Sequence, residues 1–397
     1  MALLHRRALL VLPLAAACTA PEAPNATETG AASTGAAAST GAATDTSDPT
    51  GAAAGCRFPT FARAETWLKT TDDGNCDHVL ADMFGGDCEN FHWLGLLGDP
   101  WLIREDGVYR MWFTAGNRIG ADMWEAAITE ATSVDGILWN DPKDLATDIV
   151  PLLRPGTPGL DETGTETISV VKGPDGVYRM YYTGDRGVDP SSLHVIGLAT
   201  SSDGKVWTKH PTPVLEATLP WEQKFDAGGF EVGGVLEPSV LVEGDTWRLW
   251  YTAFGRDGDA VAYARIGYAE SADGITWTKH PEPVFLGQGV DFDLAGVSHT
   301  HVIKDPTDGY HLFYVGIGLD EDLRLGHAWS ADGLAWEPNP ANPIIQGVAG
   351  EWDARLVGGP SALFVDGALR LYYMGTPEPD FSKPVHFAMT QGTCAGT

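Results

Sequence analysis

The sequence predicts an all-β fold, a five-bladed β-propeller, and three observations lead to that prediction. A phrase of the form Ser-x-Asp-Gly-x-x-Trp occurs four times, beginning at Ser133, Ser201, Ser271 and Ser330. Five other stretches read as strand, Gly-containing turn and strand, a strong hairpin signal. The 48 glycines and 26 prolines favour short strands and many turns over helices. Self-similarity about every 60 to 70 residues, with four strands per unit, is typical of a propeller.

The first 18 residues, MALLHRRALLVLPLAAAC, predict a secretory signal. Basic residues precede an apolar run that is too short to span a bilayer as a stable helix. The ending LAAAC resembles the bacterial lipobox, and this resemblance implies lipidation of Cys18. An ordinary cleaved signal is the alternative. We therefore expect a protein of the bacterial cell envelope, held by its lipid anchor in the outer membrane or at the cell surface, or a secreted one.

Residues 19–55 consist almost entirely of Ala, Thr, Gly, Ser, Pro and a few acids. Such a segment buries too little apolar surface to offset chain entropy, so we expect a disordered tether. Residues 56–397 then form the propeller domain.

Four cysteines remain after Cys18, and an even number in an exported chain suggests two disulfides. Three pairings are open, and we favour Cys56–Cys394 with Cys76–Cys88. The fifth unit lacks its own Trp phrase, and ETWLKTTDDG around Trp67 imitates it. An N-terminal strand that completes the last blade would bring Cys56 beside Cys394.

The repeated phrase itself reads as structural. Its Asp can cap the turn between the third and fourth strands of a blade, and its Gly can take positive φ. The Trp would pack between blades. An aromatic-Asp pair before the inner strands, at Asp226, Asp293 and Asp353, reads as a loop brace.

The opposite face of the propeller receives the start of each inner strand. Counting back from the second strand of each blade puts Asp99 and Glu237 at equivalent positions in blades one and three, and Gly359 in blade five. Blade two offers Thr167 with Glu166 beside it, and blade four offers His299 or Thr300, with His301 close by. Two acids that converge on one axis are what glycosyl transfer needs, one as acid and one as base or nucleophile.

On these motifs the chain resembles the five-bladed propeller superfamily of arabinanases, levansucrases and invertases, including glycoside hydrolase families 43 and 32. The resemblance covers the whole folded region and implies that Asp99 is base or nucleophile and Glu237 the general acid. A second-blade Asp usually orients the pair; here Glu166 is the acid that would support it, which departs from the family pattern. The resemblance also suggests a histidine that holds a metal or a water, with His299 and His301 as candidates and His301 as the metal ligand. No cofactor is required, and a calcium ion, structural or axial, is left open.

Other side chains on the same face are candidates for substrate binding. The exits of three strands repeat an arginine, at Arg118, Arg186 and Arg256, which could hold sugar hydroxyls through forked donors or pair with nearby acids. Trp101 could stack on a sugar ring, and His299 could contact substrate.

Two main hypotheses follow: an exported glycoside hydrolase acting on an oligo- or polysaccharide, or a non-catalytic glycan-binding propeller lipoprotein. A sialidase-like enzyme ranks last, because its related phrase is one residue longer and it needs six blades and a Tyr nucleophile. We expect a monomer that meets the membrane only through its anchor. The net charge of −29 repels phosphate backbones and argues against nucleic acid as a partner.

Overall fold

The structure is a computed structural model. It describes the backbone of residues 55–70, 96–120, 123–140, 151–186, 194–223, 225–226, 231–255, 263–307, 309–320, 322–378 and 385–394. Side chains are described for these residues except 69–70, 96–97, 117–120, 123–124, 225–226 and 231–232. Cys18, Cys76, Cys88 and Arg256 therefore lie outside the described residues, as do the expected signal and nearly all of the tether.

The prediction of an all-β fold is confirmed. Regular structure in the described ranges is β-strand apart from one short 3-10 helix, η1 (Pro220–Glu222). None of the helices in those ranges has the length and apolar character needed to cross a lipid bilayer.

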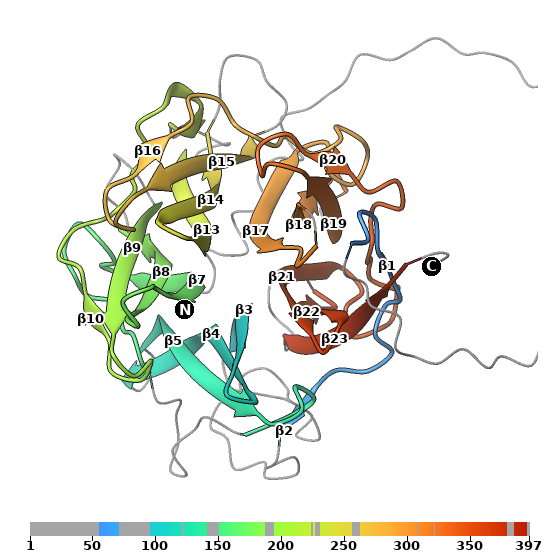
Figure 1. Cartoon of the computed structure of the whole chain (residues 1–397), viewed down its shortest axis with the longest axis horizontal. Helices are drawn as coiled ribbons and strands as arrows, with labels where there is room; N and C mark the ends of the chain where they lie inside the picture. The colour runs from blue at the N-terminus through green and yellow to red at the C-terminus, as the bar shows by residue number, and fades with distance from the viewer. Residues whose placement is uncertain are drawn as a thin grey trace, which may run out of the picture.

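The long strands follow one another in five antiparallel groups within the described chain, and the groups lie around a common centre (Figure 1). The first strand of each group lies innermost and the last lies outermost (Figure 1). Group 1 contains β3 (Leu96–Glu105), β4 (Val108–Gly120) and β5 (Met123–Ser133), followed by β6 (Leu138–Trp139). Group 2 contains β7 (Gly164–Lys172), β8 (Tyr178–Asp185), β9 (His194–Ser201) and β10 (Thr208–Lys209). Group 3 contains β13 (Gly234–Glu243), β14 (Thr246–Phe254), β15 (Ala264–Ser271) and β16 (Thr278–Lys279).

Group 4 contains β17 (Gly296–Lys304), β18 (Tyr310–Ile317), β19 (Leu323–Ser330) and β20 (Glu337–Pro338). Group 5 contains β21 (Leu356–Val365), β22 (Ala368–Thr376) and β23 (His386–Thr393). Two short pairs complete the list: β2 (Lys69–Thr70) runs parallel to β6, and β11 (Phe225–Asp226) is antiparallel to β12 (Glu231–Val232).

The outer strand of group 5 comes from the other end of the chain. β1 (Thr60–Phe61) pairs antiparallel with the last two residues of β23. A disulfide joins Cys56 to Cys394, as the sequence predicts. The expectation that this strand surrounds Trp67 is wrong, because β1 ends at Phe61. The Trp67 ring instead stacks on the His386 ring, with 4.5 Å between the ring centroids.

The repeated Ser-x-Asp-Gly phrase closes the turn after the third strand of groups 1 to 4. In group 2, Ser201 Oγ donates to Asp203 Oδ1, which also accepts the backbone N–H groups of Lys205 and Val206. The N–H donors of Val206 and then Lys205 lower the pKa of Asp203 to about 2. The same bonds recur in the other three turns.

Each of these turns also docks on the second strand of the preceding group. Tyr181 Oη donates to the Gly274 carbonyl at 2.8 Å, and the Trp250 indole donates to the Gly333 carbonyl at 2.8 Å. Arg110 reaches the Gly204 carbonyl in the same way, and the turn of group 1 docks on Tyr372 of group 5. The phrase therefore recurs because it makes the contacts between groups, and it lies away from the inner-strand positions of interest.

A second set of contacts joins the inner strands in a closed ring. One side chain on each inner strand bonds the backbone of the next strand. Ser169 Oγ accepts from Val240 N, Ser239 Oγ accepts from Val302 N, and Ser361 Oγ accepts from Leu102 N, at 2.8 to 3.0 Å. The other two links are Trp101 Nε1 to the Val170 carbonyl and His301 Nε2 to the Ala362 carbonyl, each 3.0 Å. Group 5 is thereby linked back to group 1.

Two of the three expected loop braces are present. Asp293 accepts the N–H groups of Gln288 and Val290, and Asp353 accepts two bonds from Arg63. The side chain of Asp226 is not described; in group 3 the fully buried Glu222 takes the role, bonded by Tyr251 and Lys279. Buried acids in this fold therefore need not be catalytic.

Three buried histidines predict acid sensitivity. Burial lowers the pKa of His301 to about 4, and it also lowers the pKa values of His311 and His327 below 6.5. The unfolded chain takes up protons near pH 6.5 while the folded chain does not, so stability present above that pH is lost as the pH falls. For His301 the loss between pH 7 and pH 5 is about 2 kcal/mol.

We expect urea unfolding of His301→Gln to show a smaller decrease in unfolding free energy between pH 7 and pH 5 than the wild type shows. Gln can still donate to the Ala362 carbonyl but does not titrate. Equal slopes for the two proteins would contradict the assignment.

Candidate active site

Five equivalent residues, one on each inner strand, adopt a left-handed backbone. They are Asp99 (φ 60°), Thr167 (φ 41°), Glu237 (φ 55°), His299 (φ 48°) and Gly359 (φ 51°). Each lies where the pairing of the first and second strands of its group shifts register. L-residues pay about 1–2 kcal/mol for this conformation, and for the β-branched Thr167 it is a true outlier. Strain of this kind concentrates at functional sites.

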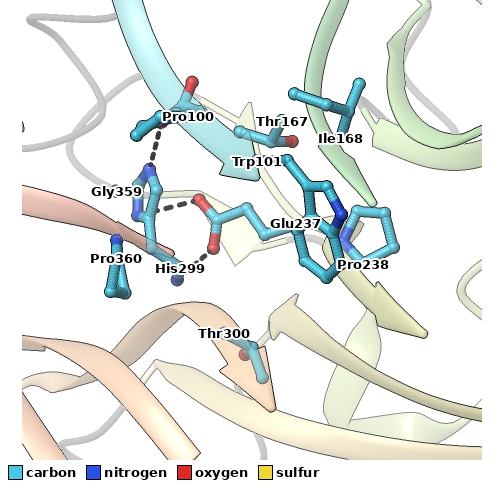
Figure 2. A pocket seen from close by; sticks show the side chains of 11 residues that line it. Pro100, Trp101, Thr167, Ile168, Glu237, Pro238, His299, Thr300, Gly359 and Pro360 are labelled. Carbon is cyan, nitrogen blue, oxygen red and sulfur yellow. Dashed lines mark hydrogen bonds and ion pairs between the residues drawn. The ribbon is translucent and has the colours of Figure 1, made fainter. Parts of the chain in front are cut away.

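These five residues and their successors line one cavity at the centre of the wheel of strands (Figure 2). It encloses about 290 Å³ of empty space, including part that is open to solvent. The remaining lining residues are Pro100, Trp101, Ile168, Pro238, Thr300 and Pro360. The register shift therefore turns one side chain from each strand toward a shared axis, and Asp99 and Glu237 meet there as the sequence predicts.

His299 lies between the two carboxylates. Its Nε2 is 3.1 Å from Asp99 Oδ1, and its Nδ1 is 3.1 Å from Glu237 Oε1. The backbone N–H of His299 also donates to Glu237 Oε2 at 2.5 Å, and Figure 2 shows the ring and this N–H directed at Glu237. The His299 side chain is 21% exposed, whereas those of Asp99 and Glu237 are 5% and 6% exposed.

Threonines on the second strands support this arrangement from behind. Thr114 Oγ1 donates to Asp99 Oδ2 at 3.3 Å and accepts the N–H of Thr167 at 3.1 Å. Thr183 Oγ1 accepts the N–H of Glu237 at 2.8 Å. These hydroxyls accept the backbone N–H groups of the two left-handed residues, which are left out of the strand pairing at the register shift. This explains the recurring Thr in FTAG and YTGD. The sequence shows this repeat, but its role was not anticipated.

Glu166 is not among the residues that line the cavity; Thr167 has that place. The carboxylate of Glu166 lies beside Gly164, at the start of β7. The described lining therefore supplies two acids rather than three.

The other candidates fall in different places. Trp101 lies in the cavity wall, but its indole N–H belongs to the ring of contacts between groups. Arg186 donates to the Gly159 carbonyl and pairs with Glu216, the pairing that was the alternative to a substrate role. The backbone of Arg118 lies in β4, and its side chain is not described.

His301 does not have the surroundings of a metal ligand. It is fully buried, its Nε2 bonds the Ala362 carbonyl, and its ring packs against Trp101 at 4.4 Å. The described residues contain no group of three or more His, Cys, Asp or Glu placed to hold a metal ion. We therefore assign His301 to the contacts between groups 4 and 5, while the calcium ion stays a prediction.

Comparison with known proteins supplies context for this geometry. No protein-family model matches the chain. An uncharacterized protein of Mycobacterium tuberculosis (strain ATCC 25618 / H37Rv), Rv1502, is 25% identical over 279 residues, which cover 68% of this chain and 85% of that protein. A β-1,2-mannobiose phosphorylase of Thermoanaerobacter sp. (strain X514) is 28% identical over 119 residues, 27% of this chain and 39% of the phosphorylase.

Solved structures of glycoside hydrolases share the fold. A thermostable family-43 glycoside hydrolase superimposes with a TM-score of 0.54 at 16% identity, covering 74% of this chain and 88% of the other. A structure described under the GH130 family of mannoside phosphorylases, which contains hydrolases of β-1,2 mannosidic linkages in Candida mannan, gives 0.53 at 19% identity, covering 74% and 84%. The chain thus has a fold found among glycoside hydrolases.

The strained backbone at Asp99 gives a stability prediction. Asp99→Gly and Asp99→Ala both remove the carboxylate, but only Gly adopts φ 60° without steric cost. We expect Asp99→Gly to have an unfolding free energy about 1 kcal/mol higher than that of Asp99→Ala, measured by urea denaturation.

Group 5 provides the reverse control, because Gly359 is the residue at the position equivalent to Asp99. Gly359→Ala should be destabilised, since its Cβ would lie 3.1 Å from Pro100 Cδ and 3.3 Å from Asp99 Cα. If Asp99→Ala were as stable as Asp99→Gly, the backbone at this position would not be strained.

Proposed function

We propose that this protein is a glycoside hydrolase in which Glu237 protonates the leaving oxygen and Asp99 activates the attacking water. The observation that carries the proposal is the convergence of two nearly buried carboxylates on one cavity, with a single imidazole between them. The fold shared with glycoside hydrolases supports the reaction class.

The spacing of the pair supports inversion of configuration. Each of the two oxygens lies 3.1 Å from its own nitrogen of His299, so a ring separates the two acids and up to about 8 Å is available between the oxygens, which allows the roughly 6.5–9.5 Å that admits a water in inverting enzymes. Retaining enzymes use a separation of about 5–5.5 Å.

We further propose that the five groups are the blades of a closed five-bladed propeller. The ring of hydrogen bonds that joins the five inner strands supports closure. The arrangement resembles families 43 and 32 of glycoside hydrolases, although Thr167 stands where those families usually have an Asp.

An exported, lipid-anchored location also remains our proposal. The disulfide of group 5 agrees with export, because disulfides persist in oxidising compartments.

Phosphorolysis is the second candidate reaction, because one relative is a mannobiose phosphorylase. It requires a cationic site for phosphate. We place hydrolysis first because the two carboxylates supply both an acid and a base at the cavity. The substrate panel should begin with β-linked mannosides, followed by arabinosides and fructosides.

We expect the wild type to release sugar from at least one of these glycosides equally well with and without inorganic phosphate. Asp99→Asn and Glu237→Gln should each lower kcat at least about 100-fold, because each removes a general acid or base. Reducing-sugar release and chromatography of the products measure both effects.

Glu166→Gln is the matched control, because it makes the same chemical change on a carboxylate outside the described cavity lining, and it should retain most activity. Glycan binding without turnover would favour the non-catalytic alternative. Dependence on phosphate, with sugar 1-phosphate as product, would favour phosphorolysis.

A further inference from the structure

We propose that His299 is a positioning residue that returns a proton from Asp99 to Glu237 after each turnover. This inference rests on the proposed hydrolysis by an inverting pair. The geometry points to it because the two ring nitrogens of His299 contact the two carboxylates, one each, at 3.1 Å.

An inverting pair ends every turnover in the wrong protonation state. Asp99 has taken a proton from the attacking water, and Glu237 has given one to the leaving oxygen. Before the next turnover Asp99 must lose its proton and Glu237 must gain one. The two carboxylates are only 5% and 6% exposed, so direct exchange of each with bulk water is hindered.

The imidazole can make both exchanges together. The O–H bond of Asp99 breaks as an N–H bond forms at Nε2, while the N–H bond at Nδ1 breaks as an O–H bond forms on Glu237. One proton enters the ring and one leaves it, so its charge is unchanged and it becomes the other neutral tautomer. With 21% of its side chain exposed, the ring can then regain the first tautomer by exchange with water.

The surroundings favour this route over others. Asp99, Glu237 and His299 are the titratable groups of the described lining, and its remaining polar side chains are Thr167, Thr300 and the indole of Trp101. Ser298 Oγ also lies 3.2 Å from His299 Nδ1, but a hydroxyl is a far weaker base than the Glu237 carboxylate. The left-handed backbone of His299 also directs its N–H to Glu237 Oε2, leaving Oε1 for the ring.

The first experiment needs no substrate. Nitrogen NMR of ¹⁵N-histidine-labelled protein reports which ring nitrogen carries the proton. The His299 signals can be assigned by their absence in His299→Asn, because Asn readily adopts positive φ and keeps the backbone N–H. We expect Asp99→Asn and Glu237→Gln each to shift both ring signals of His299. The signals of His210, whose Nδ1 contacts only Thr212, should not move.

The second experiment separates proton return from the chemical step. In rapid-quench assays with excess substrate, His299→Asn should release a burst of about one product per enzyme, followed by a slower steady phase that the wild type does not show. Later turnovers should be about 100-fold slower than the first, at the lower end of the range for a single proton-transfer group. Added imidazole should accelerate only the slow phase.

The outcomes distinguish this inference from the proposed function. A first turnover as slow as the later ones, or His299 signals that respond to neither variant, would overturn the relay even if the wild type is an active hydrolase. A wild type that cleaves no glycoside would overturn the hydrolase, and the relay with it, whereas shifts in the NMR signals would then show only that the ring bridges the two acids.

Discussion

The site depends on one backbone constraint: a single left-handed residue at the register shift of each inner strand. An ordinary strand alternates its side chains between two faces, which in this wheel point toward neighbouring groups. The register shift instead turns the side chain of one residue per inner strand toward the centre. Residues from five segments that are distant in sequence therefore meet at the cavity. The same shift sets the register of the ring of hydrogen bonds, because each donor or acceptor lies two positions after the left-handed residue. The hydrogen bonds between the inner strands and the construction of the cavity therefore have a common cause.

Much of this arrangement could be predicted from the sequence because it repeats. The Ser-x-Asp-Gly-x-x-Trp phrase and the hairpins mark the strands, and counting along equivalent hairpins brings Asp99 and Glu237 to the same level. The pairing of Cys56 with Cys394 follows from the same count. These inferences need only the period of the repeat, which survives even where individual residues vary.

Other features could not be predicted, for physical reasons. Alternation with a period of two cannot decide between Glu166 and Thr167 without knowing where the register shifts. The contacts of Trp101 and His301 with the next group depend on the distance between strands that are far apart in sequence. His299 was a candidate, but its place between two acids is a property of three strands together. The repeated arginines suggested substrate binding for a similar reason. Arg186 pairs with Glu216, and the spacing of the two residues in the sequence does not reveal that contact.

The disulfide that fastens the last group has a consequence for the life of the molecule. Its partners are separated by 338 positions along the chain, so the bond cannot form until all five groups of strands have been synthesised. Thiols stay reduced in the cytosol of most bacteria. If the protein is exported as we propose, the newly made polypeptide lacks the covalent bond on its terminal strand until it reaches an oxidising compartment, and until then only noncovalent contacts hold that strand in place.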